Sequence, residues 1–91
     1  MRVKAAIEKK LGEGLSPRRL SVVDESHLHA GHAHAPEAGE SHFRVEVVSA
    51  AFAGLSRVAR QRLVYGLLAD EMQGRIHALA LRTLTPEEDR A

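Results

Sequence analysis

The feature that restricts the fold most strongly is a segment without periodicity that lies between two stretches of alternating apolar and polar residues. Such alternation is typical of β-strands. Residues 20–26 place Leu20 and Val22 on the same side of an extended chain. Residues 43–49 begin with three apolar side chains that alternate with two charged ones, which is typical of a half-buried strand. Because the aperiodic segment 27–39 connects them, we expect an antiparallel hairpin with an unusually long loop.

Helical patterns lie on both sides of the predicted hairpin. Apolar residues recur at helical spacing over 3–11, and Gly12 or Gly14 is expected to end this first helix. A second helical stripe extends over roughly 57–73, and Ser56 before it is a suitable N-cap residue. We therefore predict one helix before the hairpin and one helix, or two in succession, after it.

A third strand is predicted over 76–84, where alternation places His77 on the same face as two leucines. The chain from 1 to 86 then has the order α-β-β-α(-α)-β. Residues 87–91 are expected to form a short acidic tail that frays. Helices packed against a three-stranded mixed sheet make a single α+β domain with two layers, which is the fold class we predict.

Length and composition exclude several classes of protein. The chain has 91 residues, no cysteine and a formal net charge of +1. One domain fits this length, and the lack of thiols excludes a disulfide framework, a cysteine nucleophile and a metal centre built from its own thiolates. No stretch approaches the roughly 20 apolar residues that cross a bilayer, and the N-terminus lacks the apolar core of a signal peptide. We expect a cytoplasmic protein with no membrane partner.

Histidine is the unusual component of this sequence, because five of the six histidines lie within 27–42. Neutral imidazole is the commonest metal ligand in proteins, and the small residues between His29, His32 and His34 allow several rings to reach one ion. A solvated loop that merely contains histidine explains the same composition, so both interpretations stay open. His77 also has two interpretations: a structural residue at the edge of the core, or a ligand if the long loop folds back over the third strand.

Motifs for catalysis and for phosphate binding are absent from the sequence. It has no HExxH pattern, no glycine-rich phosphate loop and no pattern typical of a Ser-His-Asp triad. Arg57, Arg60 and Arg62 crowd the N-terminal end of the second predicted helix, where cations oppose the helix dipole. These arginines are candidate contacts to nucleic-acid phosphates, although the small net charge favours a solvated helix face.

Several segments resemble the BolA family in this order, and together they span nearly the whole chain. They are 24–26 (DES) followed by His29, then 40–49, 52–54, 60–65 and 76–86. The SHF and HALA motifs in two of the predicted strands are specific at this spacing. The sequence departs from the family pattern at Gln61, where many members have a histidine between the two arginines.

The resemblance implies a compact α+β domain similar to the class II KH arrangement, and a non-enzymatic role without a small-molecule substrate. BolA-like proteins pair with monothiol glutaredoxins and share a [2Fe-2S] cluster with them, with glutathione on the partner side, in iron–sulfur trafficking and iron regulation. On this sequence the family's C-terminal histidine ligand is His77. The ligand from the loop falls at His29, with His32 as a close rival and with His34 and His42 as weaker candidates.

Cluster chemistry agrees with two imidazole ligands from this chain. A [2Fe-2S] centre needs four ligands, and two histidines in place of two cysteines on one iron is known coordination. Because this chain has no thiol, the sulfur ligands must come from the partner. Some BolA-like proteins are assigned DNA binding, so the alternative function is a transcriptional regulator in which Arg57, Arg60 and Arg62 contact the phosphates.

Overall fold

A three-stranded sheet forms the centre of the molecule in a computed structural model, which describes residues 3–25 and 42–90. Strand β1 pairs with β2 in antiparallel orientation, and β2 pairs with β3 in parallel, so the sheet is mixed and has the order β1-β2-β3. The elements are α1 (Val3–Leu15), β1 (Arg19–Asp24), β2 (His42–Val48), the 3-10 helix η2 (Ala50–Phe52), α2 (Arg57–Leu67), α3 (Ala69–Gly74), β3 (Ala78–Leu84) and α4 (Pro86–Arg90). The predicted α+β class and element order are confirmed.

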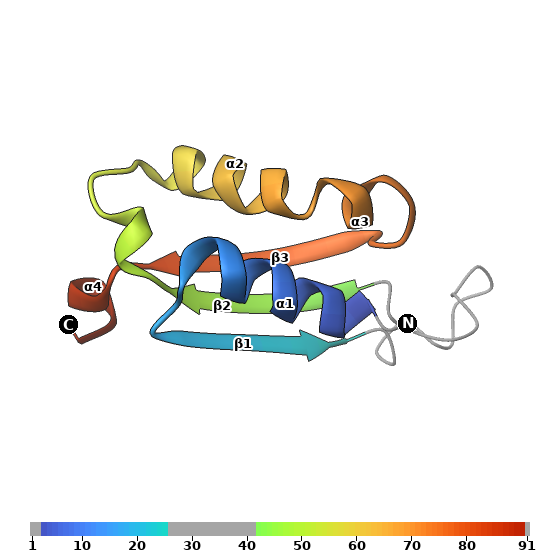
Figure 1. Ribbon diagram of the computed structural model, residues 1–91, viewed down its shortest axis with the longest axis horizontal. Helices are drawn as coiled ribbons and strands as arrows, with labels where there is room; N and C mark the ends of the chain where they lie inside the picture. The colour runs from blue at the N-terminus through green and yellow to red at the C-terminus, as the bar shows by residue number, and fades with distance from the viewer. Residues whose placement is uncertain (1–2, 26–41, 91) are drawn as a thin grey trace.

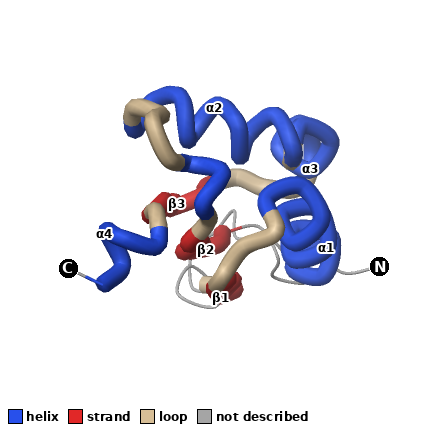
Figure 2. Tube along the Cα trace, turned by 60° about the vertical axis from the view of Figure 1, so that its left-hand side comes forward, coloured by secondary structure: helices blue, strands red, loops and turns tan. Residues whose placement is uncertain are grey.

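The sheet has one covered face and one open face. Figures 1 and 2 show α1, α2 and α3 together on one side of the strands, while α4 lies at the end of the sheet where β2 and β3 finish. Beneath the helices is a single aliphatic core, to which α1 contributes a residue at every fourth position. Its buried members include Val3, Ile7, Leu11, Leu15, Phe43, Val45, Val47, Phe52, Val64 and Leu68. Among the described residues, no helix is long and apolar enough to cross a membrane.

The predicted hairpin pairing is confirmed. Strand β1 runs beside β2 from the Arg19–Val48 pair to the Asp24–Phe43 pair. Beyond the last pair, the Glu25 N–H donates a hydrogen bond of 2.8 Å to the carbonyl of the first residue of β2. Residues 26–41, and with them the predicted loop 27–39, lie outside the described residues.

The first helix is longer than the sequence pattern predicted. It continues through Gly12 and Gly14 to Leu15, which is 4% exposed and extends the apolar stripe by one turn. Ser16 ends the helix in the left-handed conformation, with φ of 44°, and its N–H donates to the Gly12 carbonyl at 3.2 Å. The prediction of a glycine cap is wrong because burial of Leu15 favours one more turn. Gly14 instead allows close packing, since a Cβ there would lie 2.8 Å from the methyl groups of Leu67.

The predicted helix over 57–73 is two helices; the sequence pattern allowed for two but did not place the break between them at residue 68. Ser56 is confirmed as the N-cap of α2, because its hydroxyl accepts a hydrogen bond of 3.1 Å from the backbone N–H three residues later. The break between α2 and α3 falls at Leu68, whose side chain is fully buried. In α3, just after this break, the Glu71 carboxylate pairs with the Lys10 ammonium of α1 at 2.8 Å, and this ion pair joins α1 to α3.

The acidic end of the chain does not fray over its described residues, in contrast to the prediction. Thr85 and Glu88 form a reciprocal cap at the start of α4: the Thr85 N–H donates to the Glu88 carboxylate at 2.9 Å, and the Glu88 N–H donates to the Thr85 hydroxyl at 3.2 Å. Asp89 forms an ion pair with Arg19 of β1. These contacts hold α4 against the sheet.

Candidate functional site

Two histidines from different strands lie close together at one end of the sheet. His42 is the first residue of β2, and its backbone partner in the parallel register is Ala78, the residue after His77. The ring centroids of His42 and His77 are 5.9 Å apart with an interplanar angle of 76°. The His77 side chain is exposed and that of His42 is half-buried. We call these two residues the histidine pair.

The alternation predicted that His77 lies on the same face of β3 as the two leucines. This prediction is wrong, because the His77 side chain does not face the core. Strand β3 begins only at Ala78, and Ile76 is the buried residue before it, with 5% of its surface exposed. The Ile76 N–H still donates to the Glu71 carbonyl of α3, so the chain turns before the strand and the period-2 pattern does not extend back to His77. An exposed ring at this position is available to a ligand and contributes little to the core.

The other predicted ligands, His29, His32 and His34, lie outside the described residues. The described residues on either side of the segment that carries them, 26–41, are Glu25 and His42, and the Glu25 N–H donates a hydrogen bond to the His42 carbonyl at 2.8 Å.

The donor set of the described residues limits what this site can hold alone. Within residues 3–25 and 42–90, no group of three histidine or carboxylate side chains is arranged to bind a metal ion, and the whole chain lacks cysteine. Two neutral imidazoles suit zinc, iron and copper, and they can serve as the two nitrogen ligands of a [2Fe-2S] centre. The pair thus fits half of such a ligand set, and the other half must come from outside the described residues.

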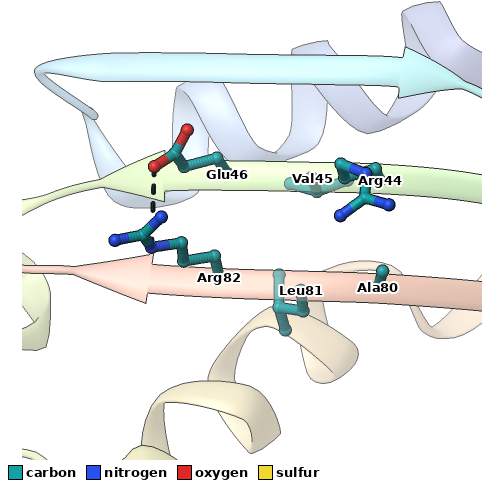
Figure 3. Close-up of a pocket in the computed structure, with 6 residues that line it drawn as sticks. All are labelled: Arg44, Val45, Glu46, Ala80, Leu81 and Arg82. Carbon is teal, nitrogen blue, oxygen red and sulfur yellow. Dashed lines mark ion pairs between the residues drawn. The ribbon is translucent and has the colours of Figure 1, made fainter.

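The open face of the sheet next to the histidine pair carries paired charges. Arg44 donates to the Glu25 carboxylate at 2.7 Å, and this hydrogen bond raises the pKa of the Arg44 guanidinium. Glu46 accepts from Arg19 at 3.1 Å and lies 3.7 Å from Arg82. Each of these three arginines therefore has a carboxylate neighbour, and two of them share Glu46. A hollow of about 190 Å³ lies over β2 and β3, and Figure 3 shows the residues that line it: Arg44, Val45, Glu46, Ala80, Leu81 and Arg82.

The three arginines predicted as a nucleic-acid surface do not form one exposed cluster. Arg57 and Arg62 are exposed. Arg60 instead forms two hydrogen bonds with the Glu88 carboxylate, at 2.7 and 3.1 Å, and further ones with the carbonyls of Leu55 and Thr83 at 3.0 and 3.2 Å. Its guanidinium also lies 5.9 Å from the ring centroid of Phe52.

Two features of the site region were missed in the sequence. The sequence held a signal for the cap of α4, since Thr85 followed three residues later by Glu88 is the pattern of a capping box. Nothing in the local sequence ranked His42 above the other histidines of its segment. That ranking depends on the parallel register of β2 and β3, which pairs residues far apart in the chain.

Fold and site together define a small α+β binding domain that presents two imidazoles at the end of a mixed sheet. The sequence pattern of the BolA-like protein family matches residues 11–88. The chain therefore belongs to the BolA-like family, and the resemblance noted from its motifs is confirmed.

Individual relatives cover most of the chain. The DNA-binding transcriptional regulator BolA of Vibrio cholerae is 49% identical over 86 residues, which are 94% of this chain and 77% of that relative. Among solved structures, BolA1 from Arabidopsis thaliana is 40% identical with a TM-score of 0.84, and the alignment covers 93% of both chains. The BolA domain of SufE1 from the same plant is 45% identical with a TM-score of 0.83, again over 93% of both chains.

Proposed function

We propose that this protein is a non-enzymatic, cytoplasmic partner of a monothiol glutaredoxin, with which it shares a [2Fe-2S] cluster in iron–sulfur trafficking and iron regulation. The observation that supports this proposal best is the histidine pair. His77 is exposed, it lies 5.9 Å from His42 between ring centroids, and both residues stand where the histidine-rich segment 26–41 joins the sheet. Membership of the BolA-like family supports this choice of cargo, and the lack of cysteine in the chain supports a site shared with a partner.

The two chains divide the ligands according to the side chains they possess. When bound, the cluster supplies iron that can be handed to another protein, and its potential rises when histidine replaces cysteine on one iron. His77 is the first ligand from this chain. The second is one of His29, His32 and His42, with His34 as a weaker candidate. Since the chain has no cysteine, the sulfur ligands come from the partner and from the glutathione bound to it.

Co-purification tests this function directly. We expect the protein and a monothiol glutaredoxin with its glutathione to elute as one coloured complex after anaerobic cluster assembly. Its visible absorption and circular dichroism should differ from those of the glutaredoxin alone, because two imidazole nitrogens replace two thiolates. A complex that is colourless, or whose spectrum equals that of the glutaredoxin alone, contradicts the proposal.

A DNA-binding transcriptional regulator is the second candidate, and the name of the Vibrio cholerae relative favours it. Arg57 and Arg62 are exposed and suit phosphate contacts, whereas the Arg60 guanidinium is already hydrogen-bonded to the Glu88 carboxylate. With a net charge of +1, we expect only weak binding that does not depend on DNA sequence. Titration of a defined duplex at physiological salt decides the matter, since tight and sequence-specific binding would place regulation first.

A further inference from the structure

The outer edge of β3 carries no other strand among the described residues, because the sheet ends there. Carbonyl groups alternate in direction along a strand. The Leu84 carbonyl accepts from Ser49 on the β2 side, whereas the Thr83 carbonyl accepts from Arg60 of α2 on the opposite side. Leu81 has the same parity as Thr83, so its N–H and carbonyl face the outer edge. Such an edge is a template for pairing with another extended chain.

A groove accompanies this edge. In Figure 1, α2 runs along β3 on the side away from β2. Between the two elements lies a cavity of about 500 Å³. It is lined by Arg57, Gln61, Leu81, Arg82, Thr83 and Leu84. The groove therefore combines leucine residues of β3 with the arginine and the glutamine of α2, while the Arg82 guanidinium is directed toward Glu46 of β2 (Figure 3).

The charges of the groove are uncompensated on the side of α2. No carboxylate lines it, and within the described part of the chain Arg57 has no ion pair. Arg82 already pairs with the Glu46 carboxylate of β2 at 3.7 Å, so Arg57 is the uncompensated cation of the groove. A ligand with carboxylates would be complementary to this groove, because guanidinium groups form strong paired hydrogen bonds with them.

We propose that the groove between α2 and the outer edge of β3 binds an extended acidic peptide segment, which adds a strand beside β3. The backbone of the segment pairs with the edge-facing groups of Leu81, and its carboxylate side chains on the α2 side meet Arg57. This surface is separate from the histidine pair, so the inference does not depend on the proposed cluster function. A nucleic-acid strand fits less well, since it has no strand-forming amides and no aromatic side chain lines the groove for base stacking.

Nuclear magnetic resonance titration of the complete ¹⁵N-labelled chain tests this proposal. The probe is a short, end-blocked peptide in which valine and glutamate alternate, compared with the same peptide carrying lysine for glutamate. We expect the acidic peptide to shift the amide signals of residues 81–83 and the lysine peptide to leave them unchanged. The Arg57→Ala variant should bind about tenfold more weakly or worse. Arg75→Ala, which removes an exposed arginine outside the groove, should bind like the wild type.

Two further probes separate the contributions to binding without altering the protein. An acidic peptide with alternate backbone amides N-methylated keeps its charges but loses the hydrogen bonds of a strand, so we expect it not to bind. Equal binding by this peptide or by the lysine peptide overturns the proposal. Tighter binding by a single-stranded oligothymidylate at the same residues also overturns it and assigns the groove to nucleic acid.

Discussion

At the scale of single residues, Arg60 shows how one side chain can join three parts of this fold. It donates to the carbonyl of Leu55 before α2, to the carbonyl of Thr83 in β3 and to the carboxylate of Glu88 in α4. Its side chain is 13% exposed, so these hydrogen bonds form largely out of water. From the sequence alone it could not be distinguished from the exposed Arg57 and Arg62, because helical spacing does not reveal contacts with distant carbonyls.

Replacing Arg60 should therefore destabilise the fold, whereas replacing an exposed neighbour should not. We expect Arg60→Ala to lower the free energy of unfolding by about 1–3 kcal/mol, because two backbone carbonyls and one carboxylate lose their donor. Arg62→Ala, the matched control, should change it by less than about 0.5 kcal/mol. Urea denaturation followed by circular dichroism measures both. Equal stability of the two variants would show that the contacts of Arg60 are not formed in solution.

The partner of Arg60 makes the stability depend on pH. Hydrogen bonds from Arg60 and from the Thr85 backbone lower the pKa of Glu88 from 4.5 to about 2. A carboxyl group with a lowered pKa stabilises the folded state above its unfolded pKa, and this stabilisation is lost as the pH falls through the folded pKa. The free energy of unfolding should therefore decrease between pH 4.5 and about 2, and less steeply in Glu88→Gln. Parallel urea curves over this pH range test the claim, which fails if the two proteins have the same profile.

At the scale of elements, the sequence predicted those parts of the fold whose signals are local. Strand β2 was found from its strict alternation, and Ser56 was found because an N-cap acts on the residues next to it. The C-terminal end of α1 and the start of β3 were not found, since both depend on which residues the rest of the fold buries. Leu15 and Ile76 are buried by distant elements, with 4% and 5% of their surfaces exposed, and this burial overrides the local glycine and period-2 patterns.

The two glycines inside α1 provide a matched test of that conclusion. Nothing lies within 4 Å of a Cβ built at Gly12, whereas a Cβ at Gly14 would lie 2.8 Å from the methyl groups of Leu67. We expect Gly12→Ala to raise the free energy of unfolding by about 0.5–1 kcal/mol, because alanine favours the helix. Gly14→Ala should gain less or be destabilising, because Leu67 must move. Thermal or urea unfolding compares them, and an equal gain in both variants would contradict the close approach of α1 to α2.

At the scale of the whole molecule, the parallel pairing of β2 with β3 brings the candidate site together. Family resemblance in the sequence pointed to His77, but period-2 alternation alone placed it toward the core. No local pattern indicated that His42 would be its neighbour, since their contact depends on a crossover through α2 and α3 and on the register of the two strands. The same topology leaves the outer edge of β3 without a strand, so the histidine pair and the groove beside α2 are separate surfaces of one small domain.

The ligand role of His77 is the central claim, and the spectrum of the complex with a monothiol glutaredoxin tests it most directly. His77→Ala, His42→Ala and the control His27→Ala, another histidine of the chain, are each assembled with the glutaredoxin, and a thermal melt checks their folding. Because His77 is exposed, we predict that His77→Ala stays folded and still binds the glutaredoxin but loses the visible circular dichroism of mixed histidine and thiolate ligation. A weaker signature in His42→Ala assigns the second ligand to His42, an unchanged one assigns it to His29, His32 or His34, and His27→Ala should keep the signature. A folded His77→Ala complex with the wild-type spectrum would contradict the account.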